Sequence, residues 1–164
     1  LTNLNCFKDQ VYSITSLNLS YSKLKDIDTE LLNISMPKLK CFNLKGNLIY
    51  LDKIFKFTKL NCLESLCLQN CFLNMTNFDV LKEYEVNFKN NEYVYEFKKL
   101  KVLDVSLNNL DYKFLNIFIC RFPVLEELNI SNNKNLFEFC KSTTLYNSNY
   151  PKGLLECIIE SEFY

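Results

Sequence analysis

The chain has 164 residues, with 19 basic and 19 acidic side chains, no histidine and 2 glycines. This length makes one domain with enough apolar content for a continuous core. Zero net charge argues against a dedicated nucleic-acid binder, the missing histidine excludes serine–histidine and cysteine–histidine hydrolysis, and two glycines cannot form a nucleotide-binding loop. No apolar run is long enough for a transmembrane helix.

The N-terminal residues 1–13 place Leu1, Leu4 and Cys6 in strand register. This segment is too short for a full copy of the pattern that follows it. We therefore expect an N-terminal cap or a shortened repeat.

Residues 14–136 carry five copies of one pattern: an apolar residue, two free positions, an apolar residue, one free position and another apolar residue. The copies start at Ile14, Leu39, Leu63, Leu100 and Leu125. Three of the four intervals fall within roughly 20–29 residues, the usual range of such repeats, and the interval after Leu63 is longer by roughly a dozen residues. The sequence thus predicts a tandem array with one insertion.

Each copy predicts one short strand whose side chains alternate between the core and the outside. In the first copy, Leu17 and Leu19 point inward while Asn18 and Ser20 point outward. The same alternation predicts the core residues Leu17, Leu19, Phe42, Leu44, Leu66, Leu68, Leu103, Val105, Leu128 and Ile130. Short repeats must stack to bury such residues, which predicts a parallel sheet.

An asparagine or cysteine recurs where each strand ends, at Asn47, Cys71, Asn108 and Asn133. Buried backbone groups need hydrogen-bond partners, and we expect these side chains to provide them as the chain turns. Ser22 is the first copy's equivalent and is expected to do this less well.

The segments between copies have the apolar spacing of helices. The apolar residues expected to face the sheet are Ile27, Leu31 and Ile34, then Leu51, Ile54 and Phe55, then Phe114, Ile117 and Phe118. Pro37 and Pro123 end two of these segments at equivalent positions.

The insertion lies near residues 80–97 and is rich in aromatic residues. Tyr93, Tyr95 and Phe97 alternate with polar residues. They either pack back onto the helical side or form an exposed docking surface, since aromatics are usually buried but insertions often carry function. Residues 137–164, which contain Leu154, Cys157 and Ile159, are expected to be a C-terminal cap or a partial repeat.

The five copies resemble the leucine-rich repeat family. The phrases LNLS, MPKL, LKGN and RFPVLEELNISNN are also similar to repeat domains of the tubulin-folding cofactor E family and of other cytoplasmic adaptors. The resemblance implies an α/β solenoid: a leucine-rich repeat horseshoe with a parallel β-sheet on its concave face and helices on its convex face. It covers residues 14–136 of one domain spanning residues 1–164.

The eight cysteines are scattered rather than clustered in terminal caps. Extracellular relatives typically carry cysteine-knotted caps, so this distribution favours reduced thiols and a cytoplasmic protein, with the nucleus as the alternative. Asn18 and Asn129 begin glycosylation sequons, but a glycan there would block the concave sheet, and we interpret these residues as strand polarity. We expect no metal site, because structural zinc needs four convergent ligands.

The outward strand positions are the first candidate binding site. The expected concave-face residues are Asn18, Ser20, Tyr21, Asn43, Lys45, Gln69, Asp104, Ser106, Leu107, Asn129 and Ser131. Lys101, Glu126 and Glu127 flank them and suggest an acidic end that meets a basic partner. The second candidate is the insertion, with Tyr93, Tyr95 and Phe97.

The sequence favours a non-catalytic protein–protein interaction module with a protein partner. No motif assigns an acid, a base or a nucleophile, so we expect no enzyme activity and no cofactor. We also expect no membrane, no direct nucleic acid and no small-molecule substrate as partners. The alternative is a subunit of a larger assembly, such as a tubulin-folding, splicing or RNA-export complex.

Overall fold

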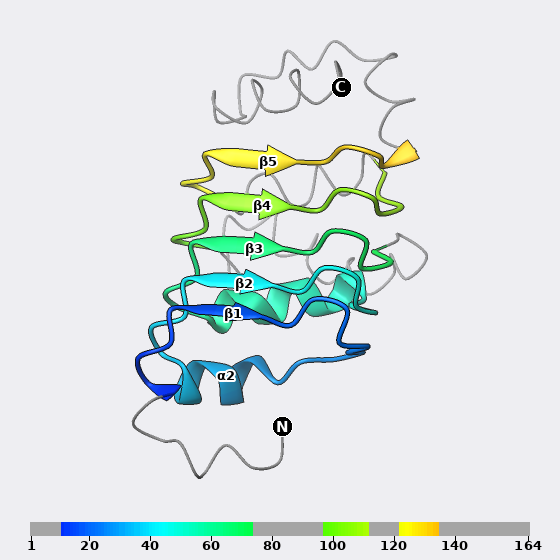
Figure 1. Ribbon diagram of the computed structural model, residues 1–164. Helices are drawn as coiled ribbons and strands as arrows, with labels where there is room; N and C mark the ends of the chain where they lie inside the picture. Colours follow the sequence, from blue (N-terminus) through cyan, green and yellow to red (C-terminus); the bar gives the residue numbers. More distant parts are fainter. Residues whose placement is uncertain (1–10, 74–96, 112–121, 135–164) are drawn as a thin grey trace.

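The computed structural model of the protein describes residues 11–73, 97–111 and 122–134. They contain one parallel sheet of five strands in chain order: β1 (Ser16–Asn18), β2 (Cys41–Asn43), β3 (Ser65–Cys67), β4 (Val102–Asp104) and β5 (Glu127–Asn129) (Figure 1). One helix, α2 (Thr29–Ser35), connects β1 to β2, and one 3-10 helix, η2 (Leu51–Lys59), connects β2 to β3. The expected parallel sheet and α/β class are confirmed.

All five strands pair in the register that the sequence pattern predicts. Leu17, Phe42, Leu66, Leu103 and Leu128 are aligned across the sheet. Of the ten predicted core residues, eight are buried, whereas Leu17 and Leu19 are half-buried. Both belong to the first copy, whose strand β1 is one of the two edges of the described sheet.

The chain turns in the same way after every strand. The seventh residue after each copy's start has a positive φ: Tyr21, Gly46, Asn70, Leu107 and Asn132, with φ of 55, 70, 52, 55 and 58°. In the first four turns, this residue's backbone N–H donates to a carbonyl of the next copy, at 2.7 to 3.0 Å. The turns are therefore hydrogen-bonded to each other beyond the ends of the strands.

A ladder of buried and half-buried asparagine amides joins copies behind the turns. Asn47, Asn108 and Asn133 each donate to a carbonyl of the preceding copy and accept from one of its N–H groups. These partners are Leu19 and Leu24 for Asn47 (2.8 and 2.9 Å), Leu68 and Leu73 for Asn108 (2.9 and 3.0 Å), and Val105 and Leu110 for Asn133 (3.0 and 3.0 Å). The expected role of these asparagines is confirmed.

Cysteine and serine take the equivalent place in two copies. The Cys71 thiol donates to the Leu44 carbonyl at 3.1 Å, as an asparagine amide would. Ser22 is exposed, and its hydroxyl donates only locally, to the Ser20 carbonyl at 3.4 Å. The weaker role expected of Ser22 is therefore also confirmed.

The α2 helix forms as expected, and Ile27 just before it is buried, but Leu31 and Ile34 do not face the sheet. Asp28 caps the helix by accepting from the Leu31 N–H at 2.9 Å, and the helix ends at Ser35 before Pro37. Thr29, Leu32 and Met36 lie one helical turn apart and are buried, whereas Leu31 and Ile34 are exposed. The start fixed by the cap turns Leu31 and Ile34 away from the sheet.

The second connection forms a 3-10 helix, with Ile54 and Phe57 buried. The Phe57 ring meets Phe42 of β2 edge-on, with ring centroids 6.0 Å apart, and so anchors η2 to the sheet. The side chains of Leu51 and Phe55 and the expected helix at 114–118 lie outside the described residues. So do residues 1–10, 74–96 and 135–164, which include most of the insertion and the C-terminal cap.

At Gly46, the space that a side chain would occupy is filled by the Tyr21 ring. A Cβ at Gly46 would lie 2.3 Å from Cδ1 of Tyr21, and a φ of 70° already disfavours any side chain. We expect Gly46→Ala to reduce the free energy of unfolding by about 1–2 kcal/mol. In a Tyr21→Asn background only the φ penalty remains, so the loss should be smaller by about 0.5 kcal/mol or more. Urea denaturation of the four proteins measures this coupling; equal losses in both backgrounds would contradict the contact.

Candidate protein-binding face

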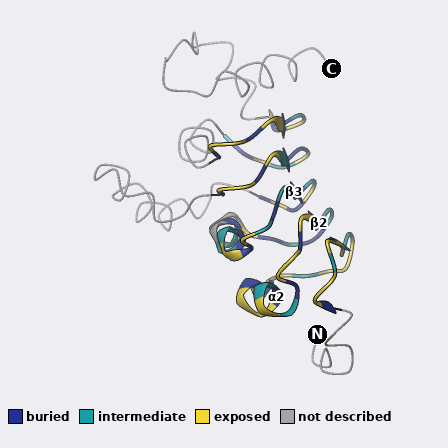
Figure 2. Ribbon diagram, turned by 90° about the vertical axis from the view of Figure 1, so that its left-hand side faces the viewer, coloured by how far each residue is buried: buried dark blue, intermediate teal, exposed yellow. Residues whose placement is uncertain are grey.

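The helices cover one side of the sheet only. In Figure 2, α2 and η2 lie on the same side of the strands, and no described segment lies over the other side. We call this other side the open face. It carries the first and third residues of each strand: Ser16, Asn18, Cys41, Asn43, Ser65, Cys67, Val102, Asp104, Glu127 and Asn129.

The third residue of four strands holds the turn that follows it. The Oδ1 atoms of Asn18, Asn43, Asp104 and Asn129 accept from the backbone N–H two residues later, at 2.9 to 3.1 Å. These side chains were predicted to bind a partner. The structure gives them a role in the fold, so substituting them perturbs the turns as well as the surface.

Ser106 was predicted to bind a partner on the outward face of the sheet, but the structure contradicts this because the side chain is not accessible to a partner. Its residue is 1% exposed. Its hydroxyl donates to Asp104 at 2.7 Å and accepts from the Gln69 amide at 2.9 Å. A hydrogen-bond chain between the third and fourth copies therefore closes over Ser106, which leaves Gln69 half-buried. Ser20, Lys45 and Ser131, at the equivalent positions, remain partly accessible.

The first residue of each strand was missed as a group of candidates. Ser16, Cys41, Ser65, Val102 and Glu127 point to the open face, and their side chains form no hydrogen bond to the turns among the described residues. The alternation that places the third residue outward also places the first outward, so the sequence held the signal. These five positions offer contacts that the fold does not use.

Charges along the amino-terminal edge of the strands pair with each other. Lys40 and Glu64 lie 2.9 Å apart, and Lys101 and Glu126 lie 2.7 Å apart. Hydrogen bonding raises the pKa of Lys40 and lowers that of Glu64, and Glu126 raises the pKa of Lys101 in the same way. The expected acidic end is therefore neutralised at Glu126, although Glu127 is exposed.

Two apolar residues of the predicted site lie on the turns at the other edge. Tyr21 and Leu107 are both exposed. The Tyr21 ring lies against Gly46, with the Lys45 ammonium 5.9 Å from the ring centroid. The structure thus brings Tyr21 and Lys45 of successive copies together, as a site extending across strands requires.

Of the three candidate binding residues in the insertion, only Phe97 lies within the described residues. Phe97 is buried and its ring stacks on Phe122, with centroids 4.9 Å apart. Of the two alternatives for the insertion, the structure supports inward packing for Phe97 and contradicts its place on an exposed docking surface, because its ring is buried against a residue that precedes the fifth copy. Tyr93 and Tyr95 lie outside the described residues.

The described cysteines, Cys41, Cys62, Cys67 and Cys71, are free thiols. Burial raises the pKa of Cys67, and it raises the pKa of Cys71 to about 11. Both thiols are therefore protonated at neutral pH and poor nucleophiles or metal ligands. Within residues 11–73, 97–111 and 122–134, no three histidine, cysteine, aspartate or glutamate residues gather as metal ligands.

No known protein-family model matches the chain, and no curated protein matches it. Among the described helices, none has the length and apolar composition needed to cross a membrane.

A hollow of about 490 Å³ lies on the covered side, between the start of α2 and η2. Its charges are already paired: Lys56 with Asp26 at 3.4 Å, and Lys59 with Glu30. Burial acts to raise the pKa of Asp26, but the Ile27 N–H and Lys56 outweigh it, and the pKa is lowered. Because these groups satisfy each other and Asp28 caps the helix, the open face remains the better candidate.

Proposed function

We propose that the chain is a leucine-rich repeat domain, an α/β solenoid that binds a protein partner through its open face. Three observations support the repeat assignment. The strands pair in register, each turn has a positive-φ residue at the same position, and asparagines link the second, fourth and fifth copies to the copy before each. Stacking of short units around one continuous core is the way such repeats gain stability.

The observation that carries the binding function is the uncovered side of the sheet. Five strands about 4.8 Å apart present a surface of roughly 20 Å, which suits a helix, a loop or a peptide. The outward residues are small or polar, with Cys41 and Val102 as apolar contacts near the middle. The paired charges Lys40–Glu64 and Lys101–Glu126 give no basic excess for phosphates, which favours protein over nucleic acid.

The test uses a partner domain selected from a displayed library of natural protein fragments. Val102→Arg places a long cation on β4, next to the middle strand of the open face, without removing a side-chain hydrogen bond. We expect it to weaken binding about tenfold or more, since central interface positions dominate affinity. The control is Ile34→Arg, which adds the same charge to the exposed side of α2 and should change affinity less than about twofold.

Circular dichroism checks that both variants fold. If Ile34→Arg abolishes binding while Val102→Arg does not, the partner binds the helical side and the proposal fails. If a folded Val102→Arg protein binds as well as the original, the open face is not the interface.

A further inference from the structure

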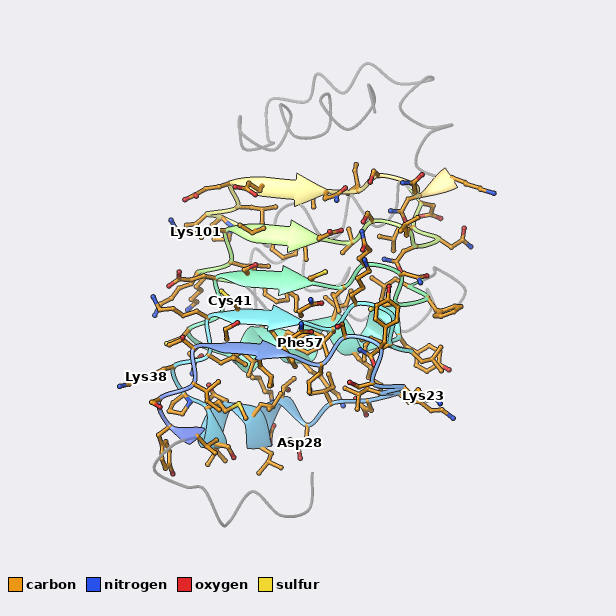
Figure 3. All side chains as sticks on the ribbon, in the orientation of Figure 1. Lys23, Asp28, Lys38, Cys41, Phe57 and Lys101 are labelled. Atoms are coloured by element: carbon orange, nitrogen blue, oxygen red, sulfur yellow. The ribbon has the colours of Figure 1, made fainter. Side chains whose placement is uncertain are left out.

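The turns at the carboxyl ends of the strands form a second surface beside the open face. We call residues 20–23, 45–48, 69–72, 106–109 and 131–134 the turn edge. It carries three large exposed apolar side chains: Tyr21, 62% exposed, Phe72, 60% exposed, and Leu107, 48% exposed. Figure 3 shows Lys23 at this edge, opposite the edge that carries Lys38 and Lys101.

All three apolar residues occupy backbone positions that disfavour them. Tyr21, Phe72 and Leu107 have φ of 55, 58 and 55°. In this left-handed region a bulky residue costs about 1 kcal/mol or more, whereas glycine and asparagine are tolerated. Gly46, Asn70 and Asn132 fill the position of Tyr21 and Leu107 in the other three copies, so the same turn forms with the favoured residues.

The fold gains little in return for this strain. A side chain stabilises a protein by leaving water, and these three remain 48 to 62% exposed, so about half or more of their apolar surface contributes nothing to folding. Strained and exposed apolar residues that share one edge are the pattern of a binding surface rather than of a core.

The charge of the turn edge indicates what binds there. Its charged residues are Lys23, Lys45 and Lys134, and these twenty residues contain no carboxylate. On the open face, the Asp104 carboxylate accepts from the N–H and the hydroxyl of Ser106. Although the whole chain is neutral, this edge is basic, and its complement is acidic.

We propose that the turn edge binds an acidic peptide segment of the protein partner, with large apolar side chains packed on Tyr21, Phe72 and Leu107. These residues belong to the first, third and fourth copies, so they span three strand spacings of about 4.8 Å, or about 14 Å. An extended segment of about four or five residues covers this distance. The inference rests on the proposed protein-binding function and adds the chemistry of the partner.

The experiment screens phage-displayed random dodecapeptides against the full chain and measures the selected peptides by fluorescence anisotropy. The turn variant combines Tyr21→Asn, Phe72→Asn and Leu107→Asn. The control variant combines Tyr12→Asn, Ile34→Asn and Val124→Asn, which removes three exposed apolar side chains elsewhere. We expect the selected peptides to be acidic with at least two large apolar residues, to bind more weakly at high salt, and to lose about tenfold or more in affinity for the turn variant alone.

The turn variant should unfold at the same or a higher urea concentration, because asparagine tolerates positive φ. A lower midpoint would assign the three side chains to the fold and overturn the inference. Recovery of no peptide, selection of neutral or basic peptides, or equal affinity for both variants would also overturn it.

The Val102→Arg variant separates this inference from the proposed function. If Val102→Arg abolishes binding of the selected peptides and the turn variant does not, the open face binds and the turn edge does not. If neither change affects binding, both proposals fail.

Discussion

Replacing Asn108 with alanine should lower the free energy of unfolding by about 3 kcal/mol or more. Its Oδ1 accepts from the backbone N–H groups of Cys71 and Leu73, at 2.9 and 3.0 Å. Its amide donates to the Leu68 and Val105 carbonyls, at 2.9 and 2.8 Å. Alanine leaves the Cys71 and Leu73 N–H groups and the Leu68 carbonyl without these partners, whereas the Val105 carbonyl still accepts from Asn133. Each unsatisfied buried group costs about 1–3 kcal/mol. This is a large share of the 5–15 kcal/mol typical of a domain.

Two further variants make the measurement specific. Asn61→Ala removes the same amide from an exposed position and should change stability by less than about 0.5 kcal/mol. Asn108→Cys should fall between the original and Asn108→Ala, because a thiol can donate to one carbonyl, as Cys71 does to Leu44. Urea denaturation measures all three, and equal stability of Asn108→Ala and Asn61→Ala would refute the structural role of the ladder.

The parts of the fold that depend on local alternation were predictable from the sequence. Within each copy, the period-two pattern separates buried from outward residues, and the asparagine marks the turn. Because the copies are alike, one inference applies to all of them, which explains why Phe42, Leu66 and Leu103 align as expected. Once the register was known, the stacking of the copies also indicated which backbone groups of the preceding copy, such as the Leu68 carbonyl, bind the asparagine side chains.

Features that depend on neighbouring copies were not predictable in this way. Ser106 has the same outward position as Ser20, yet it is buried because Gln69 of the preceding copy closes over it. The buried face of α2 was predicted only in part, because the apolar spacing selects Leu31 and Ile34, whereas the packed helix buries Thr29, Leu32 and Met36.

The candidate site was predicted in part. Tyr21 and Leu107 were expected on the surface and are exposed there, but their strained backbone was not foreseen, since bulky residues give no sequence signal of positive φ. Phe72 was overlooked because the pattern places it between two core positions, Cys71 and Leu73, without requiring either orientation. Comparing Gly46, Asn70 and Asn132 across the copies was the available clue to the turn.

Phe42→Ala should lower the free energy of unfolding by about 3–5 kcal/mol, an effect similar to that of Asn108→Ala, because it leaves a cavity in the core. Phe42 lies on the inward side of β2 and meets Phe57 of η2, so its removal loosens both the sheet and the helix that covers it. In urea denaturation, the Phe42→Ala protein should therefore unfold at a lower midpoint, because the contact between η2 and β2 is lost.

The matched control is Phe72→Ala, the same substitution at an exposed ring only one copy away along the stack. The Phe72 ring is mostly in contact with water, and alanine is smaller than phenylalanine at this positive-φ position. We therefore expect the free energy of unfolding to stay within about 0.5 kcal/mol of the original. The contrast therefore separates a phenylalanine that the fold needs from one that it does not. If Phe72→Ala is as damaging as Phe42→Ala, Phe72 supports the fold, and the turn edge loses one of its three apolar contacts. If Phe42→Ala is as mild as Phe72→Ala, the packing of η2 on the sheet is not what holds this part of the array together.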